Sequence, residues 1–167
     1  MPNYNRIGAN GKVEEVIATT VSTGVANAGE LVQTNSAGQI DPSLLPTGFG
    51  DDIKSIVAAE ALSAGDFVNI FNNAGVAEVQ LADRTNGREA NGFVLQAVTI
   101  GDPAQVFFEG VNTALTGLVP GEPYFLGTAG SVEATPTTTS GEILQCLGDA
   151  CGVTDLTTEI ANPITRA

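Results

Sequence analysis

The residues best able to do chemistry in this sequence are its 19 carboxylates and two cysteines, because histidine is absent. Without an imidazole the commonest general base and metal ligand is missing, so neither a Ser-His-Asp catalytic triad nor a Cys-His catalytic dyad can form. Cys146 and Cys151 supply two soft ligands, whereas a structural zinc site needs four ligands of the Cys and His kind. We therefore expect no metal site and no nucleophilic catalysis.

The carboxylates leave two alternatives open. The adjacent Asp51 and Asp52 could hold a divalent cation, although the sequence contains no spaced Asp/Asn loop of the calcium-binding kind. Carboxylate pairs could also hydrolyse glycosidic bonds, yet the chain has no Trp and only Tyr4 and Tyr124 among tyrosines to stack on a sugar. The sequence contains no P-loop motif for binding phosphate, and no Gly-x-Gly-x-x-Gly motif at the start of a helix. The sequence thus predicts a protein that is not an enzyme, with no cofactor and no small-molecule substrate.

Charge and hydropathy narrow the choice of partners. Six basic residues against 19 acidic ones give a net charge of −13, and the acidic residues are spread along the chain. A phosphate backbone would be repelled, so we expect no nucleic acid partner. The first residues lack a basic-then-apolar signal region, and no apolar run approaches the ~18 residues that span a bilayer. We expect no membrane partner, and we expect the chain to be kept or assembled in the cytoplasm.

The two cysteines flank a possible turn. Gly148-Asp149 lies between Cys146 and Cys151 and could reverse a hairpin, which would bring the thiols opposite each other. A disulfide is then geometrically possible. A reducing cytosol favours two free, partly buried thiols instead.

One short phrase occurs three times and positions the strands. Each copy begins with Gly and a carboxylate, continues through an apolar run and ends with Ala-Gly. The copies begin at Gly29-Glu30, Gly65-Asp66 and Gly121-Glu122, and they end at Ala37-Gly38, Ala74-Gly75 and Ala129-Gly130. Glycine adopts the positive φ of a tight turn without steric cost, and an acidic neighbour stays solvated there. Each copy therefore predicts turn, strand, turn, and the second and third copies predict hairpins.

Composition and patterning predict an all-β protein. Val, Ile, Leu and Phe make up 45 of 167 residues, enough to form a core, while 28 Gly plus Pro and 18 Thr disfavour a helical bundle. Strands with apolar residues on both faces are expected at 92–102 and 104–112. At 53–57 the apolar residues could also lie on one face of a short helix, but the β-branched residues favour a strand. We expect a compact β-sandwich or β-barrel domain over residues 51–167.

Residues 1–50 differ from the rest and predict an extended N-terminal arm. This segment is polar and interrupted by proline, so it cannot bury a core of its own. In "DPSLLP", Pro42 and Pro46 prevent continuous helix or central strand and favour an extended or single-turn conformation. The arm offers isolated apolar anchors for binding to another surface: Ile40, Leu44, Leu45 and Phe49.

Residues 60–155 resemble the β-domain of capsid decoration, or cement, proteins of tailed bacteriophages. The resemblance rests on a series of phrases in the same order: Ala64-Gly65-Asp66, Ala82-Asp83, Gly92 to Ala97, Gly101-Asp102, Leu118 to Tyr124 with Pro120 and Gly121, and Ala129-Gly130. Upstream, "AGELVQTNSAGQIDPSLLP" is similar to a phrase found before β-domains in phage head and tail-fibre proteins.

The resemblance implies a structural virion protein that binds the outer surface of the assembled head and stabilises the shell. Its implied partner is the major capsid protein, and the implied assembly is a homotrimer. On this reading residues 1–50 form the capsid-binding segment and residues 51–167 form the decoration domain. The alternative is a phage head or tail fibre module that adheres to a host surface.

Overall fold

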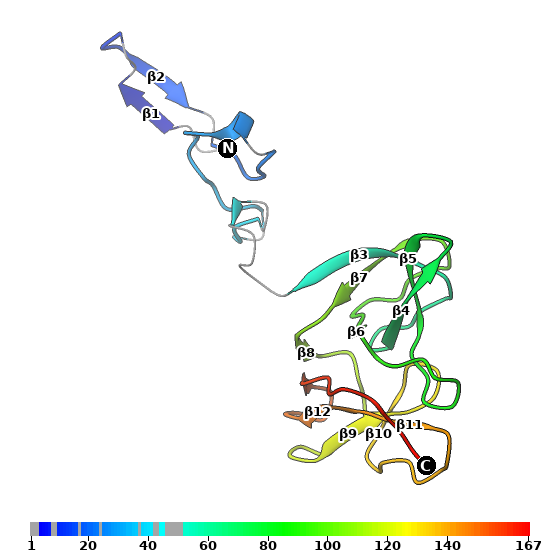
Figure 1. Cartoon of the computed structure of the whole chain (residues 1–167). Coiled ribbons are helices and arrows are strands. Elements are labelled where there is room, and N and C mark those ends of the chain that lie inside the picture. Colours follow the sequence, from blue (N-terminus) through cyan, green and yellow to red (C-terminus); the bar gives the residue numbers. More distant parts are fainter. Residues whose placement is uncertain are drawn as a thin grey trace. The chain divides into compact units, whose positions relative to one another are not determined.

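The structure is a computed structural model that describes residues 4–7, 10–16, 18–23, 25–36, 38–41, 44–45 and 52–167. The chain divides into two units, Met1–Gly50 and Asp51–Ala167. Figure 1 shows the strands of both units, coloured along the sequence.

The first unit is built from short elements joined by polar contacts. Strands β1 (Tyr4–Ile7) and β2 (Val13–Val16) form an antiparallel hairpin, and the single-turn 3-10 helix η1 (Val25–Asn27) follows. Backbone hydrogen bonds tie Thr19 to the segment around Val32, and the Asn27 side chain accepts hydrogen bonds from Thr23. The unit therefore has more local structure than an extended arm.

No described residue of the first unit belongs to the buried hydrophobic core of the chain. Every buried apolar side chain that the structure describes lies at Ile56 or beyond. A two-stranded hairpin has one layer and cannot bury its own apolar side chains. The described residues of this segment thus include no buried apolar side chain.

The second unit contains a closed five-stranded barrel, with the strand order β3-β5-β4-β6-β7 (Figure 1). Its strands are β3 (Ile53–Ala58), β4 (Phe67–Asn73), β5 (Val76–Leu81), β6 (Gly92–Phe93) and β7 (Pro103–Phe107). In β3, Ile56 and Ala58 point inward while Val57 points outward, as the two-residue period of a strand requires. The barrel interior is filled by small and branched side chains, including Val68, Val79 and Val106.

A second sheet packs beside the barrel, with the strand order β10-β9-β12-β13-β8 (Figure 1). Its strands are β8 (Gly110–Asn112), β9 (Pro123–Leu126), β10 (Val132–Glu133), β12 (Cys146–Ala150) and β13 (Leu156–Thr158); β11 (Ile143–Leu144) and β14 (Ile164–Thr165) form a separate antiparallel pair. The all-β expectation is confirmed: residues 53–107 form the closed barrel, and the strands after it form the second sheet and the separate pair.

Aromatic rings from the barrel join the two sheets in one core. Phe93 stacks on Phe107 with ring centroids 5.5 Å apart and also contacts Phe67 at 5.9 Å. These rings pack with Leu126, Leu147 and other buried side chains of the second sheet. Burial of several such side chains stabilises the unit by ~1.5–3 kcal/mol each.

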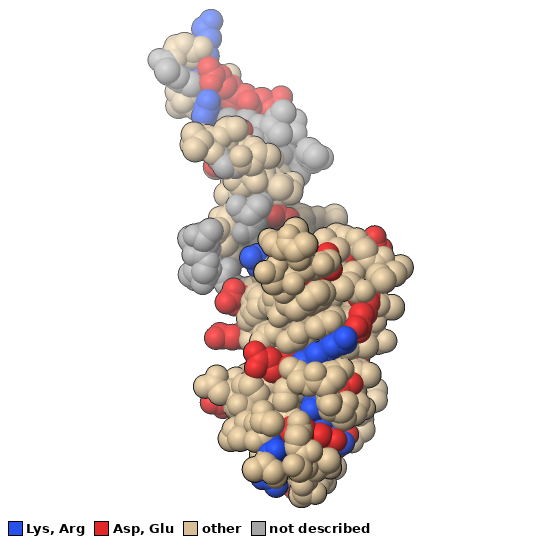
Figure 2. Space-filling view, turned by 45° about the vertical axis from the view of Figure 1, so that its right-hand side comes forward, with Lys and Arg blue, Asp and Glu red and all other residues tan. Residues whose placement is uncertain are grey.

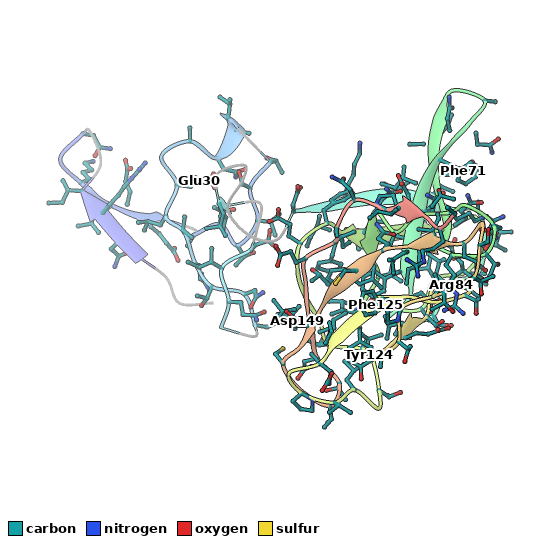
Figure 3. The ribbon with its side chains drawn as sticks, turned by 60° about the horizontal axis from the view of Figure 1, so that its bottom comes forward. Glu30, Phe71, Arg84, Tyr124, Phe125 and Asp149 are labelled. Carbon is teal, nitrogen blue, oxygen red and sulfur yellow. The ribbon has the colours of Figure 1, made fainter. Side chains whose placement is uncertain are left out.

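Two buried amides and an ion cluster fasten the barrel to the second sheet. The Asn112 amide donates to the Gly65 carbonyl (2.9 Å), and the Gln145 amide bonds with both backbone groups of Ala90. Arg84 forms ion pairs with Glu133 and with Glu142, the latter at 3.0 Å. Arg84 is labelled in Figure 3.

The turns of the repeated phrase are confirmed in the structure, but the strand expected in its first copy is wrong, because there Val32 makes only an isolated bridge with Thr19. All six of its glycines have positive φ: Gly29, Gly38, Gly65, Gly75, Gly121 and Gly130. Ala74 (φ 51°) and Ala129 (φ 49°) are also left-handed, so the Ala-Gly pairs of the second and third copies form hairpin turns with positive φ at both central residues. These turns join β4 to β5 and β9 to β10, which are the two predicted hairpins.

The strand prediction for 92–102 is wrong beyond Phe93. The chain bends at Leu95 and Gln96, and Val98 instead forms an isolated bridge with Leu62. The predicted strand at 104–112 is divided into β7 and β8 by a break at Phe108 and Glu109.

The turn expected at Gly148-Asp149 is also wrong. Both residues lie inside β12, where the pairing with β9 shifts register between Cys146 and Gly148. A Cβ at Gly148 would collide with the Thr157 carbonyl, so glycine is needed there for close approach of strands. Cys146 and Cys151 are free, as expected, but only Cys146 is half-buried; Cys151 is exposed, so the expectation of two partly buried thiols is wrong for it. Because β12 is extended at ~3.3 Å per residue, it keeps the two thiols too far apart for a disulfide.

Candidate interaction surfaces

The predicted anchors lie in the first unit, and the structure describes three of the four. Ile40 is 51% exposed and Leu45 is 37% exposed, while Leu44 is half-buried. The Leu44 amide donates to the Asp41 carbonyl (3.0 Å). Phe49 lies outside the described residues.

The hairpin of the first unit adds an apolar pair that sequence reasoning missed. Ile7 and Val13 face each other across the β1–β2 ladder and are 76% and 71% exposed. Arg6 and Glu14, one residue further along, form an ion pair on the opposite face. In each strand of the hairpin a charged residue stands next to an apolar one, Arg6 next to Ile7 and Glu14 next to Val13. This alternation of charged and apolar residues is the sequence pattern that indicates one apolar face.

The second unit is strongly acidic. Residues 51–167 contain 15 acidic and four basic residues, a net charge of −11. Figure 2 shows acidic side chains at separate places over one face of this unit, with few basic ones. Arg84 and Arg88 are already paired with carboxylates, so the surface is short of free positive charge.

Two carboxylates have shifted pKa values for opposite reasons. Burial raises the pKa of Asp66 and outweighs the hydrogen bond that it accepts from the Ser63 amide. At Asp83, burial also raises the pKa, but hydrogen bonds from Thr85 and Ala129 together with the charge of Arg88 lower it further than burial raises it. Asp66 lies in the turn that begins the second copy of the phrase, and Asp83 accepts a hydrogen bond from Ala129 in the turn that ends the third copy. Because the pKa of each group is shifted in the folded protein, each makes the free energy of unfolding depend on pH.

The described residues contain no group of three or more His, Cys, Asp or Glu side chains arranged to hold a metal ion. Asp51, one of the pair considered for a cation, lies outside the described residues. No helix in the described part of the chain is long and apolar enough to cross a membrane.

The β4–β5 hairpin projects from the second unit (Figure 3). Its tip is exposed from Asn72 to Ala77, and Val76 is 58% exposed. Phe71, labelled in Figure 3, is half-buried on the same hairpin. This hairpin is a second exposed element, in a unit that has a complete core of its own.

No protein-family model matches the chain, and no curated protein is similar to it in sequence. A solved structure that is similar in fold is the N base of the head fibre gp8.5 of bacteriophage phi29. The match has a TM-score of 0.45 and 16% identity, and it covers 65% of this chain and 92% of that one. At this level the likeness assigns no function.

Proposed function

We propose that this chain is a structural protein of a tailed-phage particle, a decoration protein that binds the outer surface of the assembled head. The major capsid protein is its partner, and three copies act together as a homotrimer. The first unit grips the shell, and the barrel unit forms the solvent-facing body. The proposal has its source in the sequence phrases at 28–46 and 60–155, which resemble phage head proteins.

The observation that carries the proposal is the contrast between the two units. The barrel unit buries two clusters of apolar side chains and satisfies its buried amides internally. Described residues of the first unit bury none, yet they include exposed Ile7, Val13 and Ile40. Apolar side chains without a second layer gain free energy when another surface covers them.

A shell-binding protein needs no catalytic group to stabilise a shell. A ligand that binds only the assembled lattice stabilises that lattice by mass action. When three weakly binding arms are linked, the second and third contacts form at high effective concentration, so the assembly binds far more tightly than one arm. Small exposed anchors are sufficient for this mode of binding.

The test compares two charge substitutions in the full chain at similarly exposed positions. Ile40→Asp alters a predicted anchor that is 51% exposed, and Val76→Asp alters the β4–β5 tip, which is 58% exposed. Because burying an isoleucine contributes ~1.5–3 kcal/mol, we expect I40D to weaken co-sedimentation with purified cognate heads by at least about tenfold. V76D should bind like the wild type. Equal binding by I40D and the wild type would contradict the assignment of the arm.

The alternative is a fibre module that adheres to a host surface. It is favoured by the phrase at 28–46, which is similar to segments found before β-domains in tail-fibre as well as head proteins. Binding of the purified chain to host cells, with none to heads, would select it. Sedimentation equilibrium gives an independent check, since a homotrimer has three times the 17.0 kDa mass of one chain.

A further inference from the structure

The barrel is closed at one seam by a single residue pair. β6 and β7 are paired only at Phe93 and Phe107, and the chain bends away at Leu95. Had β6 continued in this antiparallel register, Leu95 would lie opposite Gln105, and Ala97 opposite Pro103. The seam therefore opens immediately after the stacked Phe93 and Phe107 rings.

A hollow of about 410 Å³ occupies the place where β6 would have continued. It lies between β7 and the segment 95–99, and the residues that matter for its chemistry are Leu95, Ala97, Asp102, Pro103, Gln105 and Phe107. Leu95 and Phe107 are half-buried and pack on the core, so they form a fixed apolar floor. Asp102 is the charged residue among those lining the hollow.

The backbone of β7 presents unused hydrogen-bonding groups to this hollow. The Phe108 amide donates to the Asp52 carbonyl (2.9 Å), and the Ala58 amide donates to the Asp102 carbonyl (3.0 Å). Hydrogen-bonded and non-hydrogen-bonded pairs alternate along an antiparallel ladder, so Gln105 occupies a non-hydrogen-bonded position opposite Ser55. Its N–H and C=O consequently point away from β3, towards the open seam.

We propose that this seam is a binding site for a short extended segment of a partner polypeptide, which adds to β7 as a strand. The incoming segment takes the place of the missing part of β6 and pairs with the N–H and C=O of Gln105. Strand addition to an exposed edge is an established mode of peptide recognition, with affinity from main-chain hydrogen bonds and specificity from alternate side chains. The site is formed by residues of the second unit alone.

The lining residues restrict the segment further. An antiparallel segment runs with its C-terminal end towards Asp102, so a Lys or Arg at that end gains charge complementarity. Pro103 has no N–H and offers only its carbonyl, which limits the pairing to a few residues. The segment 95–99 walls the hollow on the other side, so a single strand fits between the walls better than the edge of a second barrel does.

The test uses a synthetic peptide, acetyl-Val-Thr-Val-Lys-amide, added to the isotope-labelled full chain and followed by NMR. We expect saturable shifts centred on the Gln105 amide, together with slowed hydrogen exchange there. A peptide with methylated backbone nitrogens should not bind, because it cannot donate the pairing hydrogen bonds. Replacement of the peptide lysine by glutamate should weaken binding.

Two substitutions at one position separate backbone from side chain. Gln105→Pro removes the N–H that faces the seam and leaves the hydrogen bonds between β3 and β7 intact, so we expect affinity to fall about tenfold. Gln105→Ala keeps that N–H and should bind like the wild type. If Q105P fails to fold, Ala97→Trp provides the test by filling the hollow, with Ala77→Trp on the exposed β5 as the control.

Absence of saturable shifts, or equal binding by the methylated peptide or by Q105P, would overturn the proposal. A further result would also overturn it. If the Gln105 amide shifts with protein concentration in the absence of peptide, and A97W suppresses that shift, then a second copy of this chain occupies the seam.

Discussion

Replacement of Gln145 by methionine should destabilise the second unit more than any loss of packing would explain. The Gln145 side chain is 2% exposed and makes three hydrogen bonds to the backbone. Its carbonyl oxygen accepts from the Ala90 amide (2.8 Å), and its amide donates to the carbonyls of Ala90 (2.9 Å) and Ala161 (3.0 Å). Methionine has a similar length but leaves these three backbone groups without a partner.

The size of the effect depends on whether water reaches the orphaned groups. Each buried polar group left unpaired costs ~1–3 kcal/mol. A hollow of about 330 Å³ is lined in part by Ala90, Gln145 and Ala161, and it gives water a route to these groups. We therefore expect the low end of the range for three groups, a loss of ~3 kcal/mol in the free energy of unfolding. In urea this loss lowers the midpoint by ~1–3 M.

A second substitution tests the hydrogen-bonding argument directly. Gln145→Glu places a buried carboxylate against two carbonyl oxygens, so its pKa in the folded protein rises above the unfolded value of ~4.3. The folded state then takes up a proton as pH falls, and the variant regains stability on acidification, whereas Q145M does not. Urea unfolding followed by circular dichroism measures both, with the exposed Gln96→Met as control. A cost below ~1 kcal/mol for Q145M, with no acid recovery in Q145E, would refute this reasoning.

Two further predictions concern turns and titration. Ala74→Asn should raise the free energy of unfolding by up to ~1 kcal/mol, because asparagine tolerates the left-handed conformation that Ala74 adopts at φ 51°, and thermal unfolding measures the gain. Urea unfolding of Asp66→Asn and Asp83→Asn across pH should give opposite trends. Because the pKa of Asp66 is raised, its protonation stabilises the folded state, and the advantage of the wild type over D66N grows as pH falls from neutral to ~4. Because the pKa of Asp83 is lowered, its contribution is complete above ~4, and the advantage over D83N shrinks as pH falls further; profiles with the same sign would contradict both assignments.

The turns could be predicted from sequence because their cause is local. A glycine next to a carboxylate, or the glycine of an Ala-Gly pair, adopts positive φ at a turn for reasons contained in a few residues. Gly65, Gly75 and Gly121 accordingly have the expected conformation, and the hairpins at Gly75 and Gly130 follow from it.

Strand ends could not be predicted, because distant partners decide them. Residues 92–100 have strand composition throughout, but the buried bridge between Leu62 and Val98 draws the chain away from β7 after Phe93. At Gly148 the sequence suggested a turn, whereas the glycine is required by the close approach of the Thr157 backbone. In both places tertiary contacts override local preference.

The exposed side chains of the first unit show why an interaction surface is hard to recognise in sequence. Ile7 and Val13 lie on one face of their hairpin through the same two-residue period that places Ile56 and Ala58 on one face of β3. In the barrel the closed sheet supplies the opposite wall, and those side chains are buried. The β1–β2 hairpin has no described second layer, so the same pattern leaves its apolar pair in solvent. Whether such a pattern gives a core or a binding surface is therefore set by the layer opposite it, and in the first unit a partner would have to supply that layer.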